Sequence, residues 1–259
     1  MSEKEFVNWI CTIVEPAIKC MADGASLALN ISNNIFMPGS PARSTYVERL
    51  ILEMEDRFGL SLMDRLIWEN PNKPPGPIQW ASKKRVQLGG GFEHVIWLTN
   101  NPHKVFSNNQ RVLQPHSETH KKLIAQGGEK RKVTYGDGDF TIRHGSFGRP
   151  TAGKIPRNIL RHSHNSVQNR AYKAECQRRG IPDHGAMMPY SLARFLVDFL
   201  TEEGQRVADP FAGSMTVPQA CEDAGRQWVA TERIVAIINA ETADASREMG
   251  PVFDQIRKE

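Results

Sequence analysis

Residues 207 to 216, with the sequence VADPFAGSMT, contain the side chains best suited to binding a ligand. The carboxylate of Asp209 follows a short apolar run, and a glycine turn and an amphipathic stretch come next. In doubly wound α/β proteins, nucleotide-like ligands bind where a strand ends in a carboxylate and a helix begins. Gly213 lets the backbone approach a ligand closely because it has no Cβ.

A second carboxylate, Glu232, ends the next predicted strand and lies 23 residues after Asp209. This spacing suits an acceptor for the two ribose hydroxyls of an adenosine. The loop lacks the GxGxxG pattern, which disfavours a dinucleotide-dependent oxidoreductase. Spacing alone also fits a strand, turn and helix with a purely structural role, so both interpretations stay open here.

The middle of the chain is strongly basic. From Lys83 to Arg179 there are 19 Lys and Arg against 6 Asp and Glu, a local charge of +13, whereas the remaining residues sum to −9. Seven of the eight histidines also lie in this part of the sequence. A basic segment between two acidic ones indicates contact with a polyanion, and a solvated basic loop is the alternative.

The sequence predicts no metal site. His116 and His120 are four residues apart, but the residues between them do not form an HExxH pattern. The four cysteines are scattered and form no CxxC pair, so we expect buried free thiols in a reducing cytoplasm.

These side chains need an α/β scaffold to position them, and hydrophobic periodicity predicts one in two parts. The first part contains two helices and three strands, predicted over Phe6–Ile18, Ala25–Ile31, Tyr46–Phe58, Leu62–Trp68 and Phe92–Leu98. Strands separated by helices indicate βαβ units and a largely parallel sheet. Tryptophans in these apolar runs, Trp9 among them, are expected in the core.

The second part begins near Pro182. It contains a helix with its apolar face between Leu192 and Leu200, and then four elements predicted over Arg206–Asp209, Val217–Ala224, Gln227–Thr231 and Ile234–Met249. Between the two parts, Asn100 to Gly180 shows little sustained periodicity. A segment of this kind inside a compact domain is usually functional or inserted.

Composition excludes several classes of protein. The chain has 259 residues, 39% of them hydrophobic and 24% charged, with a net charge of +4. These values fit a globular protein with a substantial core. No run of about 18 apolar residues occurs, so no membrane span or membrane partner is expected. The N-terminus does not read as a secretory signal, and we expect a cytoplasmic protein of prokaryotic or phage-like origin.

Three motifs resemble those of the S-adenosylmethionine-dependent amino DNA methyltransferases, which methylate N4 of cytosine or N6 of adenine. Asp209 to Thr216 resembles their DPFxGSGTT motif, with Met215 where the family has Gly. Residues 184–189, HGAMMP, resemble the HPAxFP motif that covers the methionine end of the cofactor. Glu232 matches the acidic residue that holds the ribose.

The resemblance implies an α/β, Rossmann-like methyltransferase fold with a mostly parallel sheet and an irregular basic insertion for target recognition. The motif order is that of the permuted β group. It implies a catalytic-side half over 1–100, a target-recognition region over 101–180 and a cofactor-binding half over 181–259. The implied S-adenosylmethionine contacts are His184, Met188, Pro189, Asp209, Pro210, Phe211, Gly213, Ser214, Thr216 and Glu232.

Residues 67–85 resemble a stretch typical of the N4-cytosine members of the family, so N4 of cytosine is favoured and N6 of adenine stays the alternative. The expected partner is double-stranded DNA, from which the target base would be flipped. The basic residues expected to contact it, mostly at its phosphates, are Lys84, Arg85, Arg143, Arg149, Lys154, Arg157 and Arg161.

The family's catalytic tetrapeptide, Ser- or Asp-Pro-Pro-aromatic, occurs nowhere in these 259 residues. The resemblance places it before the first helix, so the catalytic residues stay unassigned. A second hypothesis follows, in which this chain is a non-catalytic DNA- and cofactor-binding piece, truncated or completed by a separate N-terminal polypeptide. A restriction endonuclease is a further partner that the resemblance implies.

Overall fold

The structure is a computed structural model that describes residues 2–180, 183, 185 and 187–232. It divides into two compact units, and each is described by itself. The larger unit is formed by Met1–Ser107 and Asn158–Glu259, and the smaller by Asn108–Arg157.

A four-stranded sheet organises the larger unit, with the strand order β1-β3-β2-β6. Its strands are β1 (Ser26–Ile31), β2 (Ser61–Glu69), β3 (Phe92–Thr99) and β6 (Ile159–Arg161). β3 is antiparallel to both β1 and β2, whereas β6 is parallel to β2. β1 and β2 therefore run in the same direction, connected by α2 (Tyr46–Phe58), as the predicted βαβ unit requires. The antiparallel β3 between them makes this sheet mixed.

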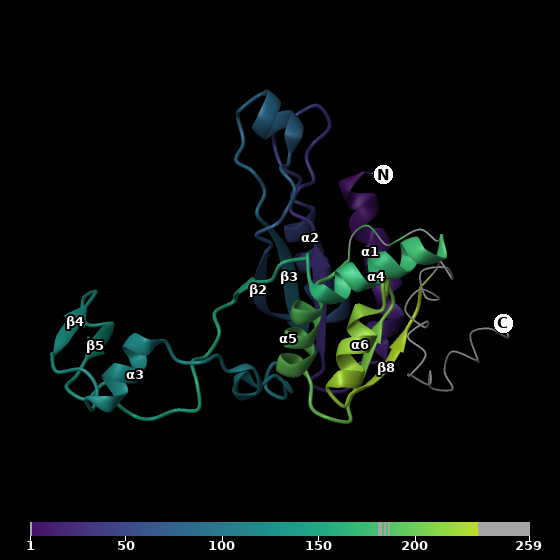
Figure 1. Cartoon of the computed structure of the whole chain (residues 1–259). Helices are drawn as coiled ribbons and strands as arrows, with labels where there is room; N and C mark the ends of the chain where they lie inside the picture. Colours follow the sequence, from purple (N-terminus) through teal and green to yellow (C-terminus); the bar gives the residue numbers. More distant parts are fainter. Residues whose placement is uncertain (1, 181–182, 184, 186, 233–259) are drawn as a thin grey trace. The chain divides into compact units, whose positions relative to one another are not determined.

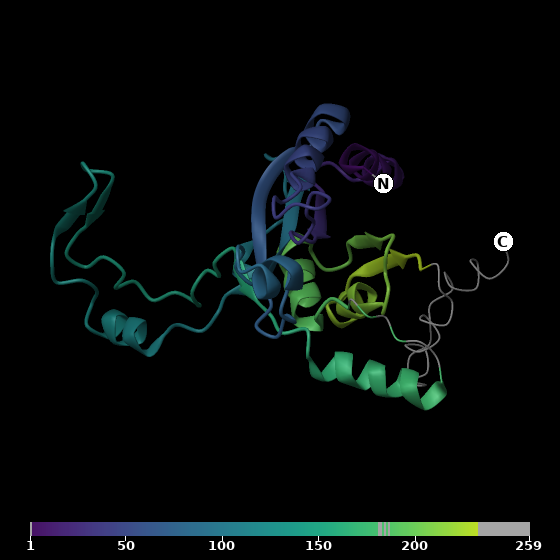
Figure 2. The same ribbon diagram turned by 90° about the horizontal axis from the view of Figure 1, so that it is seen from above.

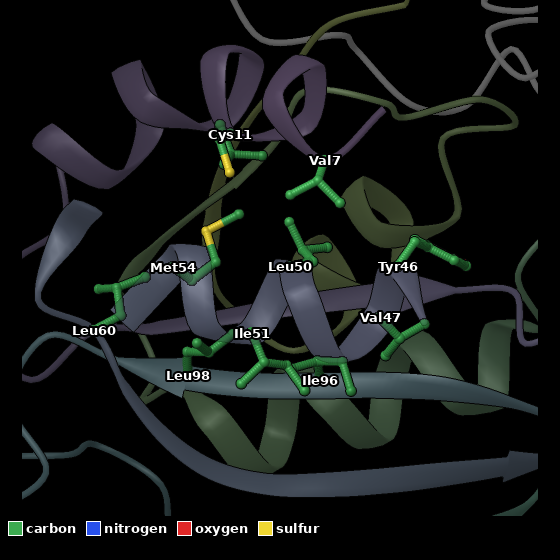
Figure 3. Close-up of a cluster of buried hydrophobic side chains, with 11 residues drawn as sticks. Val7, Cys11, Tyr46, Val47, Leu50, Ile51, Met54, Leu60, Ile96 and Leu98 are labelled. Atoms are coloured by element: carbon green, nitrogen blue, oxygen red, sulfur yellow. The ribbon is translucent and has the colours of Figure 1, made fainter. Parts of the chain in front are cut away.

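Two N-terminal helices cover one face of this sheet (Figure 3). α1 (Glu3–Lys19) starts with a capping box between Ser2 and Glu5, and it packs on α2. Leu50 and Met54 of α2 are fully buried between α1 and the strands, together with Ile96 and Leu98 of β3. The spacing of the buried residues is that of an amphipathic helix, which explains why the sequence predicted both helices.

One helix, α5 (Tyr190–Leu200), packs on the opposite face of the sheet (Figure 2). Its residues Leu192, Leu196 and Leu200 form a cluster with side chains of β2 and β3, including Trp68 and Trp97. A second stripe of α5, Ala193 and Val197, packs against α6 (Thr216–Asp223). The same helix therefore holds both the four-stranded sheet and the C-terminal elements.

The C-terminal elements form a separate two-stranded parallel sheet, β7 (Arg206–Asp209) and β8 (Gln227–Ala230). Among the described residues, β7 pairs with β8 alone, and β1 pairs with β3 alone. β1 contains no proline, no charged residue and no bulge. Proteins commonly use such features to protect a strand edge, and β1 has none of them.

The basic middle of the chain is more structured than its sequence indicated. The smaller unit contains η2 (Asn109–Val112), α3 (Glu118–Ala125) and the hairpin of β4 (Val133–Tyr135) and β5 (Phe140–Ile142). Figure 1 labels α3, β4 and β5. This unit contains fewer residues than the region 101–180 that the resemblance implies for target recognition. Residues 158–180 instead contribute β6 and α4 (Val167–Arg179) to the larger unit.

Four further sequence predictions concern Trp9, the cysteines, the last helix and membrane-spanning helices. Trp9 is 43% exposed, so its core assignment was wrong: it lies about 200° around α1 from the buried Val7. Cys20 is exposed, while the other three cysteines are buried free thiols. The helix predicted over Ile234–Met249 lies outside the described residues. No helix in the described part of the chain is long and apolar enough to cross a membrane.

Leu192→Ala tests the role of α5, because its side chain is fully buried where the helix meets the sheet. We expect a loss of about 2–5 kcal/mol in the free energy of unfolding, from lost burial and the cavity left behind. Urea denaturation measures it. The matched control, Leu52→Ala on α2, removes a side chain that is 58% exposed and should change stability by under about 0.5 kcal/mol. Equal losses would contradict this account of the core.

Candidate functional site

The ends of β7 and β8 and the turn before α6 bring the predicted ligand-binding residues together. The Asp209 carboxylate accepts a hydrogen bond from the Phe211 backbone N–H at 3.0 Å. The backbone of Asp209 accepts one from Thr231 N–H at 3.0 Å, and Ala212 N–H donates to the Thr231 carbonyl at 3.1 Å. These bonds hold the loop after β7 against the end of β8.

Glu232 lies at this junction, as the sequence spacing predicted. Its Oε2 accepts a hydrogen bond from the Gly213 backbone N–H at 2.9 Å. Gly213 adopts φ +50°, a left-handed conformation that glycine tolerates best. The two carboxylates that are 23 residues apart in sequence are therefore at one site, at the carboxyl ends of two adjacent parallel strands. This is where open α/β sheets bind ligands.

Met215 adopts the left-handed conformation as well, with φ 57° and ψ 23°, directly before α6. A non-glycine residue is disfavoured there by about 1 kcal/mol. The Met215 side chain is buried against Ala212 and Ala230, and this burial offsets the backbone cost. The loop thus keeps the backbone geometry of a glycine turn although the sequence replaces the family's glycine. Next to it, the buried hydroxyls of Ser214 and Thr216 form a hydrogen bond of 3.0 Å.

Burial raises the pKa of the Asp209 carboxyl above its usual range. The hydrogen bond from Phe211 lowers this pKa and the nearby Glu232 carboxylate raises it, but desolvation is the largest effect. Two carboxyl groups held close in a partly buried site favour neutral donors and hydroxyl groups as ligands. An anion at this position would be repelled.

An exposed aromatic pair borders the site. The Phe211 ring is 56% exposed and lies 6.4 Å from the Trp9 ring of α1, centroid to centroid. An exposed ring next to two carboxylates provides an apolar surface for a planar group. Trp9 was not predicted as a site residue, because its sequence context resembles a core position.

The predicted cofactor cover, residues 184–189, is only partly described. Pro189 is the N-cap residue of α5 and is fully buried. Met188 packs between the two clusters that α5 joins. Both residues are therefore placed by α5, and their contact with a cofactor stays a prediction. His184 lies outside the described residues.

The predicted DNA-contacting residues are exposed and fall in both units. Lys84, Arg85 and Arg161 belong to the larger unit, where Arg161 lies 3.6 Å from Glu69. The other four belong to the smaller unit: Arg143, Arg149, Lys154 and Arg157. Within the described residues, no three His, Cys, Asp or Glu side chains are grouped so that they could hold a metal ion.

A polar pocket that the sequence did not indicate lies at α4. It has a volume of about 220 Å³ and is lined by Asn72, His164, Asn165, Asn169, Arg170 and Lys173. α4 was missed because its buried positions include Asn169 and Cys176, which weaken the apolar periodicity.

Comparison with known proteins identifies relatives that match most of the chain. A family model described as DNA methylase matches residues 1–241. The Type II methyltransferase M.PvuII of Proteus hauseri is 31% identical over 232 residues, which cover 90% of this chain and 68% of the relative. M.HindIII of Haemophilus influenzae is 39% identical over 198 residues, covering 75% of this chain and 58% of the relative.

Solved structures show the same relationship. The PvuII DNA methyltransferase (cytosine-N4-specific) superposes with a TM-score of 0.72 at 26% identity, covering 98% of this chain and 76% of that chain. The M1.HpyAVI–SAM complex superposes with a TM-score of 0.54 at 14% identity, covering 93% and 83%. The second likeness shows the fold, and together they confirm the predicted Rossmann-like methyltransferase fold.

Asp209→Asn tests the electrostatics of the site, because asparagine can still accept the Phe211 N–H. The pKa of Asp209 is higher in the folded chain than in the unfolded chain, so ionisation of Asp209 weakens the fold as the pH rises through the folded-state value. We expect the variant to be more stable than the parent at pH 7 and equally stable near about pH 3, where both forms are neutral.

Urea denaturation at the two pH values measures the difference. The control is Asp56→Asn, an exposed carboxylate on α2, which should change little at either pH. A variant of Asp209 that is less stable than the parent at pH 7 would contradict the assigned cost of burying this carboxylate.

Proposed function

Because this chain belongs to the DNA methylase family, we propose that it binds S-adenosylmethionine at the ends of β7 and β8 and serves methyl transfer to N4 of cytosine in double-stranded DNA. The observation that carries the proposal is the junction of Asp209, Gly213 and Glu232, where a glycine turn meets two carboxylates. Site-specific methylation of an exocyclic amine is the function that this junction and the family membership support best.

The residues at the junction fit the chemistry of this cofactor. The Glu232 carboxylate accepts one backbone N–H, and a carboxylate has enough acceptor positions to bind the two ribose hydroxyls as well. The exposed face of Phe211 suits a purine ring, and the turn at Gly213 keeps side chains away from the cofactor backbone. When bound, S-adenosylmethionine supplies the methyl group. The residues of the chain hold and orient the cofactor.

N4 of cytosine is favoured over N6 of adenine for two reasons. Residues 67–85 have the sequence typical of N4-cytosine members, and a relative named as cytosine-N4-specific superposes over 98% of the chain. Transfer to N6 of adenine is the alternative. The relatives' description as Type II methyltransferases also supports a role in modification beside a restriction endonuclease.

The exocyclic amine of either base is a poor nucleophile because its lone pair is delocalised into the ring. A polar side chain and a carbonyl must accept its protons, and an aromatic ring must stack on the flipped base. These 259 residues contain no Ser- or Asp-Pro-Pro-aromatic to do so. We propose that a polypeptide carrying the tetrapeptide completes the site. Such a piece would bind as an added strand along the second edge of β1, where no strand pairs among the described residues.

Target recognition is proposed for residues 101–180, which include the smaller unit with its hairpin and four of the exposed basic residues predicted to contact DNA. Exposed Lys and Arg bind DNA phosphates without reading sequence, and this fixes the register of the protein on the duplex. Lys84, Arg85 and Arg161 of the larger unit are proposed to add phosphate contacts.

Glu232→Ala tests the cofactor site. Removal of the ribose acceptor should weaken S-adenosylmethionine binding by about tenfold to a hundredfold, because a hydrogen bond to a charged group contributes about 1.5–3 kcal/mol. Calorimetry measures the affinity. The control is Glu55→Ala, an exposed carboxylate on α2, which should bind like the parent. An unchanged affinity in the Glu232 variant would refute the assignment.

DNA binding should depend steeply on salt. If about six phosphates are contacted, affinity falls roughly a thousandfold between about 50 and 200 mM salt, because counterions are released from DNA on binding. Fluorescence anisotropy with a labelled duplex measures this slope. A flat response would show that the basic residues do not contact the DNA backbone.

Methyl transfer by these 259 residues alone should be very slow. A polypeptide carrying the tetrapeptide, added in trans, should raise the rate at least about a hundredfold, because positioning of the reacting groups is most of the catalysis. A tritiated-methyl assay on duplex DNA measures both rates, and the same polypeptide with its first acceptor changed to alanine is the control. Rapid turnover without any addition would refute the need for a second piece.

A further inference from the structure

The polar pocket at α4 lies at the carboxyl ends of the parallel strands β2 and β6 and belongs entirely to the larger unit. Residues from three segments line it: Asn72 from the loop after β2, His164 and Asn165 from the loop after β6, and side chains of the first two turns of α4. None of these residues belongs to the cofactor site or to the basic residues already proposed to contact DNA.

A buried amide fixes the orientation of His164. Asn70 is 8% exposed, and its Oδ1 accepts the backbone N–H of Asn72 at 3.1 Å, which turns its Nδ2 toward His164. Asn70 Nδ2 lies 2.9 Å from His164 Nδ1. Asn70 Oδ1 lies 3.3 Å from the same ring nitrogen, so the amide of Asn70 holds the imidazole through Nδ1, and Nε2 is the ring nitrogen that it does not engage.

A second buried amide fixes the loop that carries His164. Asn169 is 5% exposed, and its Nδ2 donates to the His164 carbonyl at 2.8 Å. The backbone N–H of Asn169 donates to the hydroxyl of Ser166, the N-cap residue of α4. Buried and hydrogen-bonded side chains of this kind hold a binding site in place before a ligand arrives.

The pocket is positively charged. Lys173 and Arg170 line it, and α4, 13 residues long, begins beside it, so its N-terminal partial charge adds to theirs. Arg170 Nη1 donates to Asn165 at 3.1 Å, which aligns the guanidinium with the pocket wall. Asp183 lies 3.7 Å from Lys173 and is a carboxylate that faces this cation, while Glu69 at the end of β2 lies 3.6 Å from Arg161.

Two cations, an imidazole held in place and the amides of Asn72 and Asn165 suit a tetrahedral oxyanion, whose oxygens accept several hydrogen bonds at once. The volume of about 220 Å³ accommodates one phosphodiester group. We propose that this pocket binds a phosphate of the DNA backbone and fixes the register of the duplex on the larger unit. The assignment rests on the proposed function, because it takes DNA as the substrate.

Salt-dependent DNA binding tests the pocket. Lys173→Gln and Arg170→Gln should each weaken binding of a labelled duplex about threefold to tenfold at moderate salt and lower the salt slope by about one, whatever the sequence of the duplex. The matched control is Lys19→Gln, an exposed lysine paired with Glu15 on α1, which should leave affinity and slope unchanged.

Two substitutions of His164 distinguish a residue that donates a hydrogen bond to the ligand from one with a structural role only. His164→Gln retains an N–H donor and should bind DNA within about twofold of the parent, whereas His164→Leu should lose about threefold to tenfold. Equal stability of the two variants in urea shows that both fold. Calorimetry with inorganic phosphate distinguishes the sources of the ligand: we expect weak binding by the parent that is lost in Lys173→Gln.

The outcomes for the pocket and for the proposed function are distinct. If the parent binds DNA with a steep salt slope but the two glutamine variants match Lys19→Gln, the pocket assignment is wrong and the proposed function stands. The assignment is also overturned if the parent binds inorganic phosphate but the glutamine variants do not change the salt dependence of DNA binding. That result would show a site for a free anion. If the parent does not bind DNA, both proposals fail.

Discussion

The packing of α5 on two surfaces is the constraint on which the rest of the larger unit depends. One stripe of its leucines is buried against β2 and β3, and a neighbouring stripe of Ala193 and Val197 is buried against α6. Small residues on the second stripe allow α6 to approach closely, and α6 in turn places the turn after β7. The junction of Asp209, Gly213 and Glu232 is therefore coupled to the core of the four-stranded sheet through one helix, although the two sheets share no strand pair in the described residues.

Both proposed sites use the same structural rule and differ in charge. The junction at β7 and β8 and the pocket at β2 and β6 each lie at the carboxyl ends of parallel strands, where loops can present side chains without disturbing the sheet. The junction has two carboxylates, which suits hydroxyl groups. The α4 pocket has two cations and an imidazole held by a buried amide, which suits phosphate. This difference in charge between the two sites fits the proposed binding of a nucleoside-like cofactor at one and of a nucleic acid at the other.

Local signals in the sequence were enough to predict that Asp209, Gly213 and Glu232 come together. Asp209, Gly213 and Glu232 occur at strand ends and turns, where residue type and spacing report backbone geometry directly. Strand direction could not be predicted in the same way, because hydrophobic periodicity is the same in parallel and antiparallel strands. β3 is antiparallel to its neighbours, where a largely parallel sheet was predicted. α4 and its pocket depend on buried amides, Asn70 and Asn169, whose partners are distant in sequence. Trp9 was misplaced because an apolar run does not report which side of a helix faces the core.

The central claim is that the turn between β7 and α6, with the end of β8, forms the cofactor site. Hydrogen exchange of the full chain, with and without S-adenosylmethionine, tests it most directly. We expect slower exchange of the backbone amides of residues 211–216 and 231–232 when the cofactor is added, and unchanged exchange in α3 and the β4–β5 hairpin. Protection confined to other segments, or no protection at saturating cofactor, would contradict the account.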